Sequence, residues 1–99
     1  MSRIRHTVNV RLKHPAGSPE ESAFLAAVQD LGAIPGVENF ELLCQVGTLT
    51  PYTFGFPMEF ADQETYDAYS AHPEHVAFVQ TSWGPAVADA LELDFVVIS

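Results

Sequence analysis

The sequence predicts an α+β domain of the ferredoxin-like type, with the element order β-α-β-β-α-β and one antiparallel sheet. Residues 4–12 alternate between apolar and polar side chains except at His6, and this alternation has the period of a half-buried strand. Further strand-like stretches follow in the middle and at the end of the chain, and two stretches of helical spacing separate them. The 99 residues contain no repeat or linker and are enough for one core, so residues 1–99 are expected to form a single domain.

The charge of the chain limits its partners. Lys and Arg number 4 against 13 Asp and Glu, which gives a formal net charge of −9 at pH 7. That charge repels nucleic acids and anionic membranes, so neither is an expected partner. The single cysteine, Cys44, excludes an internal disulfide and is typical of a reducing compartment. The first residues contain no apolar signal segment and no apolar run reaches membrane-spanning length, so we expect a cytoplasmic protein.

The first strand is followed by a helix with recognisable ends. His6 is the one polar side chain on the apolar face of the strand, which also carries Val8. Ser18 is the expected N-cap of the helix, and Glu21 is placed to complete a capping box. Gly32 follows the last residue of helical spacing and is expected to end the helix.

The middle of the chain predicts two more strands, residues 40–46 after a Pro35-Gly36 turn and residues 52–60. One face of the second of these strands is almost entirely aromatic. It carries Tyr52, Phe54, Phe56, Met58 and Phe60. Gly55 and Pro57 on the opposite face predict a bulge, because proline cannot donate a hydrogen bond to a ladder.

The second helical region is predicted to be broken in two. Asp62 is a good N-cap, and the helix after it should end at His72 because Pro73 disfavours a helical conformation at the residue before it. Pro73 also suits the first turn of a new helix. Residues 83–85, Trp-Gly-Pro, are predicted to interrupt that helix, and residues 86–90 to add another helical turn.

Residues 91–98 are predicted as the last strand. Helices on one side of the sheet leave its other face uncovered. On that face the first strand places Arg5, Thr7, Asn9 and Arg11. The last strand places there either Leu93, Phe95 and Val97, or Val96 and Ile98. A mixed polar and apolar face on a small domain is most simply covered by a second copy, so we expect a homodimer.

The segment AYSAHPEHVAF, residues 68–78, spaces Tyr69, His72 and His75 three residues apart. Zinc needs three or four converging ligands, which two histidines on either side of Pro73 do not supply, so no metal site is predicted. His72 either bonds a free backbone amide between two helices or belongs to a site. His75 falls in the first turn of the new helix, where the helix dipole favours the neutral imidazole that a general base needs.

Five stretches, taken in order, carry a family resemblance: IRHTVNVRLK, IPGV, YTFGFPMEF, YDAYSAHPEHVAFV and LDFVVI. Together they resemble the stress-responsive α/β-barrel (Dabb) family over essentially the whole chain. The most specific stretch is the Tyr-x-x-His-Pro-x-His run from Tyr69 to His75. The resemblance implies a homodimer in which two sheets face each other inside a dimeric α+β barrel, with the helices outside.

The resemblance also implies a chemistry. Olivetolic acid cyclase-type members of the family use a similar run for a cofactor-independent aldol condensation that closes a polyketide ring. On that basis His75 is the expected acid/base catalyst, and Tyr69 is its partner at a substrate carbonyl or enolate. His6 is expected to line the pocket, His72 matches the first histidine of the run, and no cofactor is implied.

A mostly apolar pocket with a few polar groups is the expected site for a hydrophobic or aromatic small molecule. The side chains expected to bind the substrate are His6, Val8, Phe24, Tyr52, Phe54, Tyr66, His72 and Phe78. Two plainer interpretations stay open at this point. The aromatic side chains can be ordinary core, and His6 can be a buried histidine satisfied by Tyr69 or by the backbone.

Three functions therefore compete. The first is a small-molecule binding protein or cofactor-independent enzyme with one apolar pocket per subunit, of the polyketide-cyclase or aldol type. The second is a non-catalytic stress-response protein whose role lies in a stable assembly. The third is a monooxygenase of the wider dimeric α+β barrel superfamily, or a haem-binding member with His75 as an axial ligand.

Overall fold

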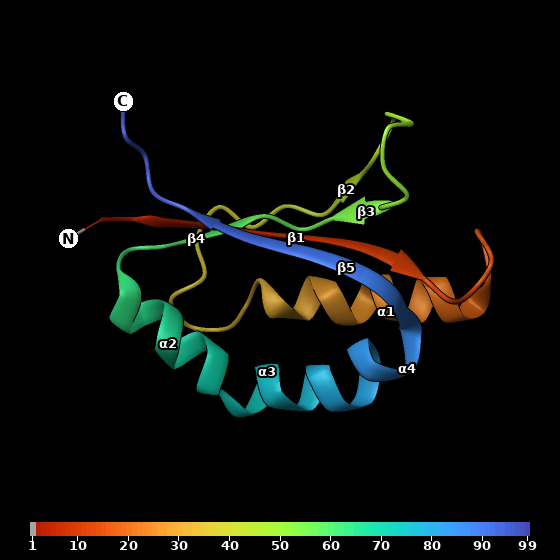
Figure 1. Ribbon diagram of the computed structural model, residues 1–99. Helices are drawn as coiled ribbons and strands as arrows, with labels where there is room; N and C mark the ends of the chain where they lie inside the picture. Colours follow the sequence, from red (N-terminus) through yellow and green to blue (C-terminus); the bar gives the residue numbers. More distant parts are fainter. Residues whose placement is uncertain (1) are drawn as a thin grey trace.

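The computed structural model describes residues 2–99 and has the predicted ferredoxin-like architecture, with all helices on one face of an antiparallel sheet (Figure 1). Met1, the first residue of the predicted domain, lies outside the described residues. The elements are β1 Ile4–Leu12, α1 Pro19–Leu31, β2 Leu43–Cys44, β3 Phe54–Gly55, β4 Met58–Phe60, α2 Gln63–Ala71, α3 Pro73–Phe78, the π-helical segment η1 Val79–Trp83, α4 Gly84–Ala86 and β5 Val87–Phe95.

Strand β1 is the centre of the sheet. It pairs antiparallel with β5 on one side and with β3 and β4 on the other, and β2 extends the sheet beyond β3. Its alternation is the predicted one: the side chains of Ile4, His6, Val8, Val10 and Leu12 are buried, whereas the residues between them are half-buried or exposed. The core therefore lies between this face of β1 and the helices.

Strands β3 and β4 form one line along β1 with no bulge, so the bulge predicted at Gly55 and Pro57 is wrong. Asn9 faces Gly55 and His6 faces Met58, which leaves an equal number of residues between the pairs on both strands. Pro57 interrupts only the ladder bonds, because it has no N–H to donate. The irregularity of the sheet lies on the other side of β1, where the register against β5 shifts between Arg11 and Leu12.

The predicted strand 40–46 is much shorter in the structure, where only Leu43–Cys44 pairs as β2. Asn39 has a left-handed backbone, with φ of 51°, and this interrupts the extended chain just before the predicted strand begins. The Glu41 N–H donates to the Pro57 carbonyl at 3.1 Å, but Pro57 has no N–H to return the bond. A regular ladder cannot form at that point.

The N-cap of α1 is the predicted one, but the capping box is not. Ser18 Oγ accepts from the Glu21 N–H at 3.2 Å. The Glu21 carboxylate accepts from the Gly17 N–H at 3.1 Å, one residue earlier than in a capping box. The reason is that the Ser18 N–H already donates to the Pro15 carbonyl at 3.1 Å.

The break between α2 and α3 is confirmed at His72. Asp62 caps α2 by accepting from the Thr65 N–H at 2.8 Å, and α2 ends at Ala71. His72 then caps α3, because its Nδ1 accepts from the Glu74 N–H at 3.1 Å. Of the two roles predicted for His72, the structure thus shows the first, a bond to a free backbone amide between two helices.

The predicted interruption at residues 83–85 is wrong, and so is the helical turn at 86–90. The helix continues from α3 through η1 into α4, because Pro85 falls in the first turn of α4, where no N–H is needed. The chain becomes extended at Val87, earlier than predicted. It stops pairing after Phe95, which lies opposite Arg5, because β1 itself begins one residue earlier at Ile4.

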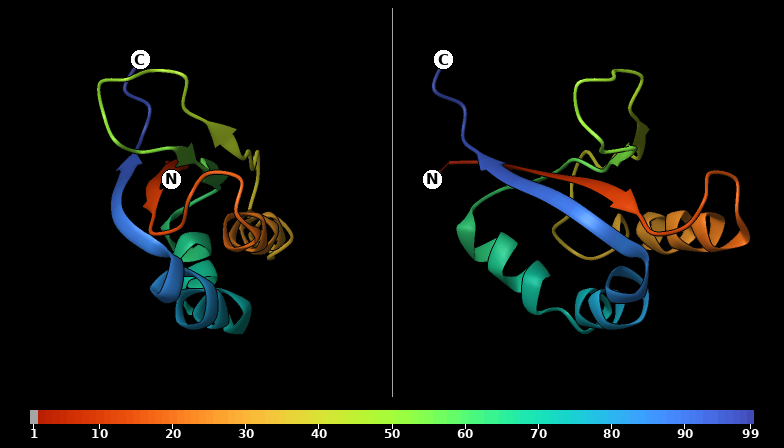
Figure 2. Two further views of the ribbon diagram at one scale, coloured as in Figure 1. Left: turned by 90° about the vertical axis from the view of Figure 1, so that its right-hand side faces the viewer. Right: turned by 45° about the vertical axis from the view of Figure 1, so that its right-hand side comes forward.

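The register of β5 decides which side chains lie on the uncovered face of the sheet. Leu91, Leu93 and Phe95 lie opposite Asn9, Thr7 and Arg5 and share that face with them. Their exposed fractions are 41%, 42% and 51%. The loop after β2, yellow-green in Figures 1 and 2, and the C-terminal tail both rise on this side, away from the helices. One side of the subunit thus presents apolar groups that nothing within it covers.

Gly36 is expected to be the most sensitive glycine of the fold. Its φ is +91°, and a Cβ built there lies 2.5 Å from Thr65 Cγ2. Thr65 cannot rotate freely, because its Oγ1 donates to Asp62 at 2.7 Å. Gly36→Ala should therefore lower the free energy of unfolding by about 2–4 kcal/mol, from left-handed strain and overpacking together, as measured by urea unfolding.

Gly17→Ala is the matched control, because Gly17 has a φ of +78° with nothing within 4 Å of the added Cβ. Its free energy of unfolding should decrease only by the cost of the left-handed strain, about 1–2 kcal/mol. Thr65→Ser removes Cγ2 and keeps a hydroxyl. In a double-mutant cycle, Gly36→Ala in the Thr65→Ser background should therefore lower the free energy of unfolding by about as much as Gly17→Ala does. Equal losses for the two alanine variants would show that the contact with Thr65 is unimportant.

Candidate functional site

A small cavity of about 60 Å³ lies between the helix-facing side of the sheet and the helices. Every layer of the fold contributes to it: β1, the segment between β3 and β4, and β5 from the sheet, and α1, α2, α3 and η1 from the helices. The lining residues are His6, Val8, Leu31, Phe56, Tyr69, His75, Phe78, Trp83 and Glu92. Its wall is therefore mostly apolar, with two imidazoles, one phenol and one carboxylate.

His6 is held by a carboxylate and a phenol from two other elements. Its Nδ1 lies 2.6 Å from Asp94 Oδ1 and 2.9 Å from the Tyr66 hydroxyl, and that hydroxyl also donates to both Asp94 oxygens at 3.0 and 3.1 Å. A nitrogen facing a carboxylate carries the proton, so Nδ1 donates and Nε2 keeps the free lone pair. The nearest carboxylate to Nε2 is Glu92, at 3.9 Å. His6 is 5% exposed, and these partners satisfy it there.

His75 is oriented by the backbone of α2. Its Nδ1 lies 3.0 Å from the Ser70 carbonyl oxygen, which can only accept, so Nδ1 carries the proton and Nε2 holds the lone pair. The ring lies beside Tyr69, with centroids 4.7 Å apart and planes tilted by 51°. The break at Pro73 makes this possible, since Tyr69 lies in the last turn of α2 and His75 in the first turn of α3.

The two tyrosines near the histidines are held in the protonated form. Burial raises the pKa of Tyr69 well above its usual value, and the nearby Glu92 carboxylate adds to the effect. Burial also raises the pKa of Tyr66, followed by its hydrogen bond to Asp94. Both rings pack on Phe60, with centroids 5.0 Å from Tyr69 and 4.9 Å from Tyr66. Tyr69 is therefore a hydrogen-bond donor in the cavity at any pH near neutrality.

Of the ten site residues predicted from the sequence, five line this cavity: His6, Val8, Tyr69, His75 and Phe78. Tyr66 lies behind His6 and positions it. Phe24 is buried against Phe78, with ring centroids 5.9 Å apart, and Phe54 packs against the core. Tyr52 lines a separate hollow next to β2, and His72 caps α3. Four predicted residues thus lie outside both the cavity lining and the first contacts of His6.

The site residues predicted from the sequence did not include Leu31, Phe56, Trp83 and Glu92, which line the cavity, or Asp94, which bonds His6. Trp83 comes from the π-helical turn η1, where the Gly84 N–H bonds the Val79 carbonyl five residues back, and no sequence pattern announces such a turn. The two acids could be recognised in the sequence, because Glu92 and Asp94 alternate with leucines in the last predicted strand. Two acids on one face of an otherwise apolar strand, opposite a strand whose apolar face carries His6, were a usable signal.

Within residues 2–99, no group of three His, Cys, Asp or Glu side chains is placed to hold a metal ion. The same residues include no helix that is long and apolar enough to cross a membrane.

The family is established by comparison with known proteins. The profile of the Stress responsive A/B Barrel Domain (Dabb) matches residues 4–97, so this chain belongs to the Dabb family. No curated protein matches it.

Solved structures agree with the fold. A Dabb family protein with a ferredoxin-like fold from Mesorhizobium loti is 48% identical, with a TM-score of 0.96 and 100% of each chain covered. A dimeric ferredoxin-like protein of unknown function from Thermobifida fusca is 24% identical, with a TM-score of 0.79 over 97% of this chain and 92% of that chain. A hydroxynitrile lyase from Passiflora edulis is 17% identical, with a TM-score of 0.83 over 97% of this chain and 94% of that one. The last two are similar in fold alone.

The raised pKa values of Tyr66 and Tyr69 predict an alkaline limit to stability. In the unfolded chain a tyrosine loses its proton near pH 10, while these two keep theirs in the folded state. Their contribution to stability is thus complete below pH 10 and decreases as the pH rises above it. Urea unfolding between pH 8 and 11 should show this decrease, and the double variant Tyr66→Phe/Tyr69→Phe should show a smaller one. An unchanged slope in the double variant would contradict the assignment.

Proposed function

We propose that this protein is a cofactor-independent acid/base enzyme that acts on a carbonyl compound in the cavity between His6, Tyr69 and His75. The observation that carries the proposal is the placement of two imidazoles with oriented lone pairs and one protonated phenol in a single mostly apolar cavity. Small-molecule sites combine an apolar wall with a few oriented polar groups in this way.

The chemistry that suits these groups is aldol-type bond formation or its reverse. His75 Nε2 takes the proton from the carbon next to a carbonyl group, and the C–H electron pair moves into an enolate. Tyr69 donates a hydrogen bond to the enolate oxygen, where the charge develops. The enolate carbon then attacks a second carbonyl carbon, and the proton held by His75 passes to the new alkoxide. No oxidant, reductant or cofactor is required.

The size of the cavity bears on the substrate. A volume of about 60 Å³ admits a group of a few heavy atoms, which suits the reacting end of a molecule. If the reaction is of the polyketide-cyclase type, only the reacting part of the substrate occupies this cavity. The Passiflora edulis hydroxynitrile lyase, which shares the fold alone, supports only the point that a subunit of this shape can serve a lyase.

We also propose that the active form is a homodimer joined through the uncovered face of the sheet. Leu91, Leu93 and Phe95 are about half exposed there, although large apolar groups are usually covered. Val46 in the loop after β2 and Ile98 in the tail are 98% and 94% exposed. That loop and the C-terminal tail both rise on the uncovered side of the sheet (Figure 2). A second copy related by a two-fold axis would cover all of these groups. The Thermobifida fusca protein is described as dimeric, which supports a dimer for this fold.

The enzymatic proposal is tested by exchange of carbon-bound protons. In D₂O the protein should accelerate deuterium exchange next to the carbonyl of small aldehydes and ketones, followed by proton NMR. His75→Ala should lower this rate about a hundredfold, the usual size of a general-base effect. His14→Ala, at a histidine of the loop before α1, is the matched control and should leave the rate unchanged.

His75 is half-buried and fills little of the core, so its replacement should change the midpoint of urea unfolding only slightly. A large loss of stability in His75→Ala would identify the residue as a structural element of the helix break. If the wild-type protein shows no exchange above the buffer rate with any small carbonyl compound, the non-catalytic alternative is favoured.

The dimer is tested by charges placed on the uncovered face. Leu93→Asp/Phe95→Asp should convert the protein to a monomer, because it brings four carboxylates together in a two-fold interface. Val76→Asp/Val79→Asp is the matched control: these valines are 42% and 40% exposed on the helical side. Sedimentation equilibrium at tens of micromolar should give a dimer for the wild type and the control. A monomeric wild type at that concentration would refute the proposal.

A further inference from the structure

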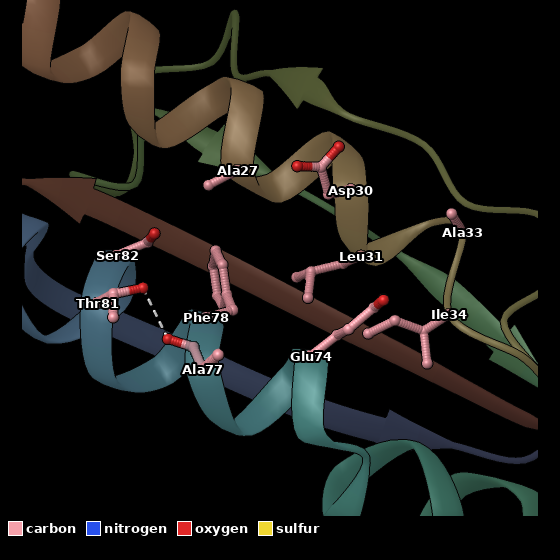
Figure 3. Close-up of a pocket in the computed structure, with 10 residues that line it drawn as sticks. All are labelled: Ala27, Asp30, Leu31, Ala33, Ile34, Glu74, Ala77, Phe78, Thr81 and Ser82. Carbon is pink, nitrogen blue, oxygen red and sulfur yellow. Dashed lines mark hydrogen bonds between the residues drawn. The ribbon is translucent and has the colours of Figure 1, made fainter.

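A groove of about 450 Å³ runs between α1 and α3 on the outer side of the helices (Figure 3). Its size lies in the usual range for small-molecule sites, unlike the inner cavity of about 60 Å³. Ile34, Ala77 and the residues that Figure 3 places around them make its floor and walls largely apolar.

The groove and the inner cavity share two lining residues, Leu31 and Phe78. Both side chains are buried, with 2% and 8% of their surface exposed, and Figure 3 shows them side by side between the two helices. They form the wall that separates the groove from the space where His6 and His75 lie.

The charges along this path all have one sign. Asp30 on α1 and Glu74 on α3 line the groove, and Glu92 lines the inner cavity. Among the described residues, no Lys or Arg side chain lines either space, since the basic residues lie on β1 and directly beside it. With a net charge of −9 for the whole chain, this environment attracts a cation and repels a carboxylate or a phosphate.

We propose that the groove is the outer lobe of the site and binds the ammonium-bearing end of an amphipathic small molecule. The apolar part of the ligand lies on Ile34 and Ala77, its ammonium group faces Asp30 and Glu74, and its other end passes Leu31 and Phe78 into the cavity. The inference rests on the proposed function for the identity of the cavity as the reaction site. It adds a substrate class: cationic amphiphiles, and not free acids or phosphate-bearing thioesters.

Binding is measured on the full chain with octylammonium and octanoate, two probes that share a chain length and differ in charge. Calorimetry at low ionic strength should give an affinity for octylammonium about tenfold higher than for octanoate, and high salt should reduce the difference. Trp83 is the only tryptophan, and its ring lies 6.4 Å from that of Phe78. Its fluorescence should therefore change when the probe reaches past the shared wall.

Two pairs of variants test the groove. Asp30→Asn/Glu74→Gln should abolish the preference for the cation, whereas Glu20→Gln/Glu41→Gln, which changes the net charge equally at exposed positions, should keep it. Ala77→Phe fills the groove and should remove binding, whereas Ala26→Phe, on an exposed position of α1 outside the groove, should not. None of the residues changed in these variants lines the inner cavity or belongs to its acid/base groups.

The outcomes separate this inference from the enzymatic proposal. Octanoate binding as tightly as octylammonium, or binding that survives Ala77→Phe, would overturn the groove as a cation site. Binding in the groove without any change in Trp83 fluorescence would overturn its link to the cavity. His75→Ala should keep the preference for octylammonium over octanoate, because His75 does not line the groove. Loss of catalysis in that variant therefore leaves the charge preference of the groove intact.

Discussion

The pairing register between β1 and β5 is the constraint on which the rest of the structure depends. Residues on a strand alternate between two faces, so a slip of one residue would exchange every side chain of β5 between the helix side and the uncovered side. In the observed register Leu93 and Phe95 lie opposite Thr7 and Arg5, and Asp94 lies opposite His6. One set of contacts thus places the apolar groups on the outer face and the acids on the inner face.

The inner acids explain how a histidine can lie in the core of a domain of this size. A buried imidazole without a partner costs on the order of 1–3 kcal/mol. The 2.6 Å contact with Asp94 and the hydroxyl of Tyr66 remove that cost and also set which nitrogen of His6 carries the proton. The same side chains that make the burial tolerable therefore leave a free lone pair directed away from them, which is the property that a catalytic or binding group needs.

Local interactions account for the parts of the fold that were predicted correctly. The alternation of residues 4–12, the caps at Ser18 and Asp62 and the break at Pro73 each depend on residues within one turn or one strand. The histidine run was sufficient to place His75 beside Tyr69, because both lie next to the same break. His6 was expected to face the helices, and its strand parity alone decided this.

Long-range pairing decided what the sequence could not. The sequence left two faces open for the last strand, because an apolar strand has the same local pattern in either orientation, and only its hydrogen bonds to β1 select one. Glu92 and Asp94 alternate with apolar residues in the sequence, but only the pairing with β1 shows that Asp94 lies opposite His6. The length of β2 depended on Pro57, which lies between β3 and β4 and has no N–H to return a bond. The position of Trp83 depended on a π-helical turn that has no sequence signature. By itself the sequence determined the order of the elements, the helix break and the family run, since these follow from near neighbours. The tertiary structure decided the faces, the strand lengths and the composition of the cavity, since these require partners from distant parts of the chain.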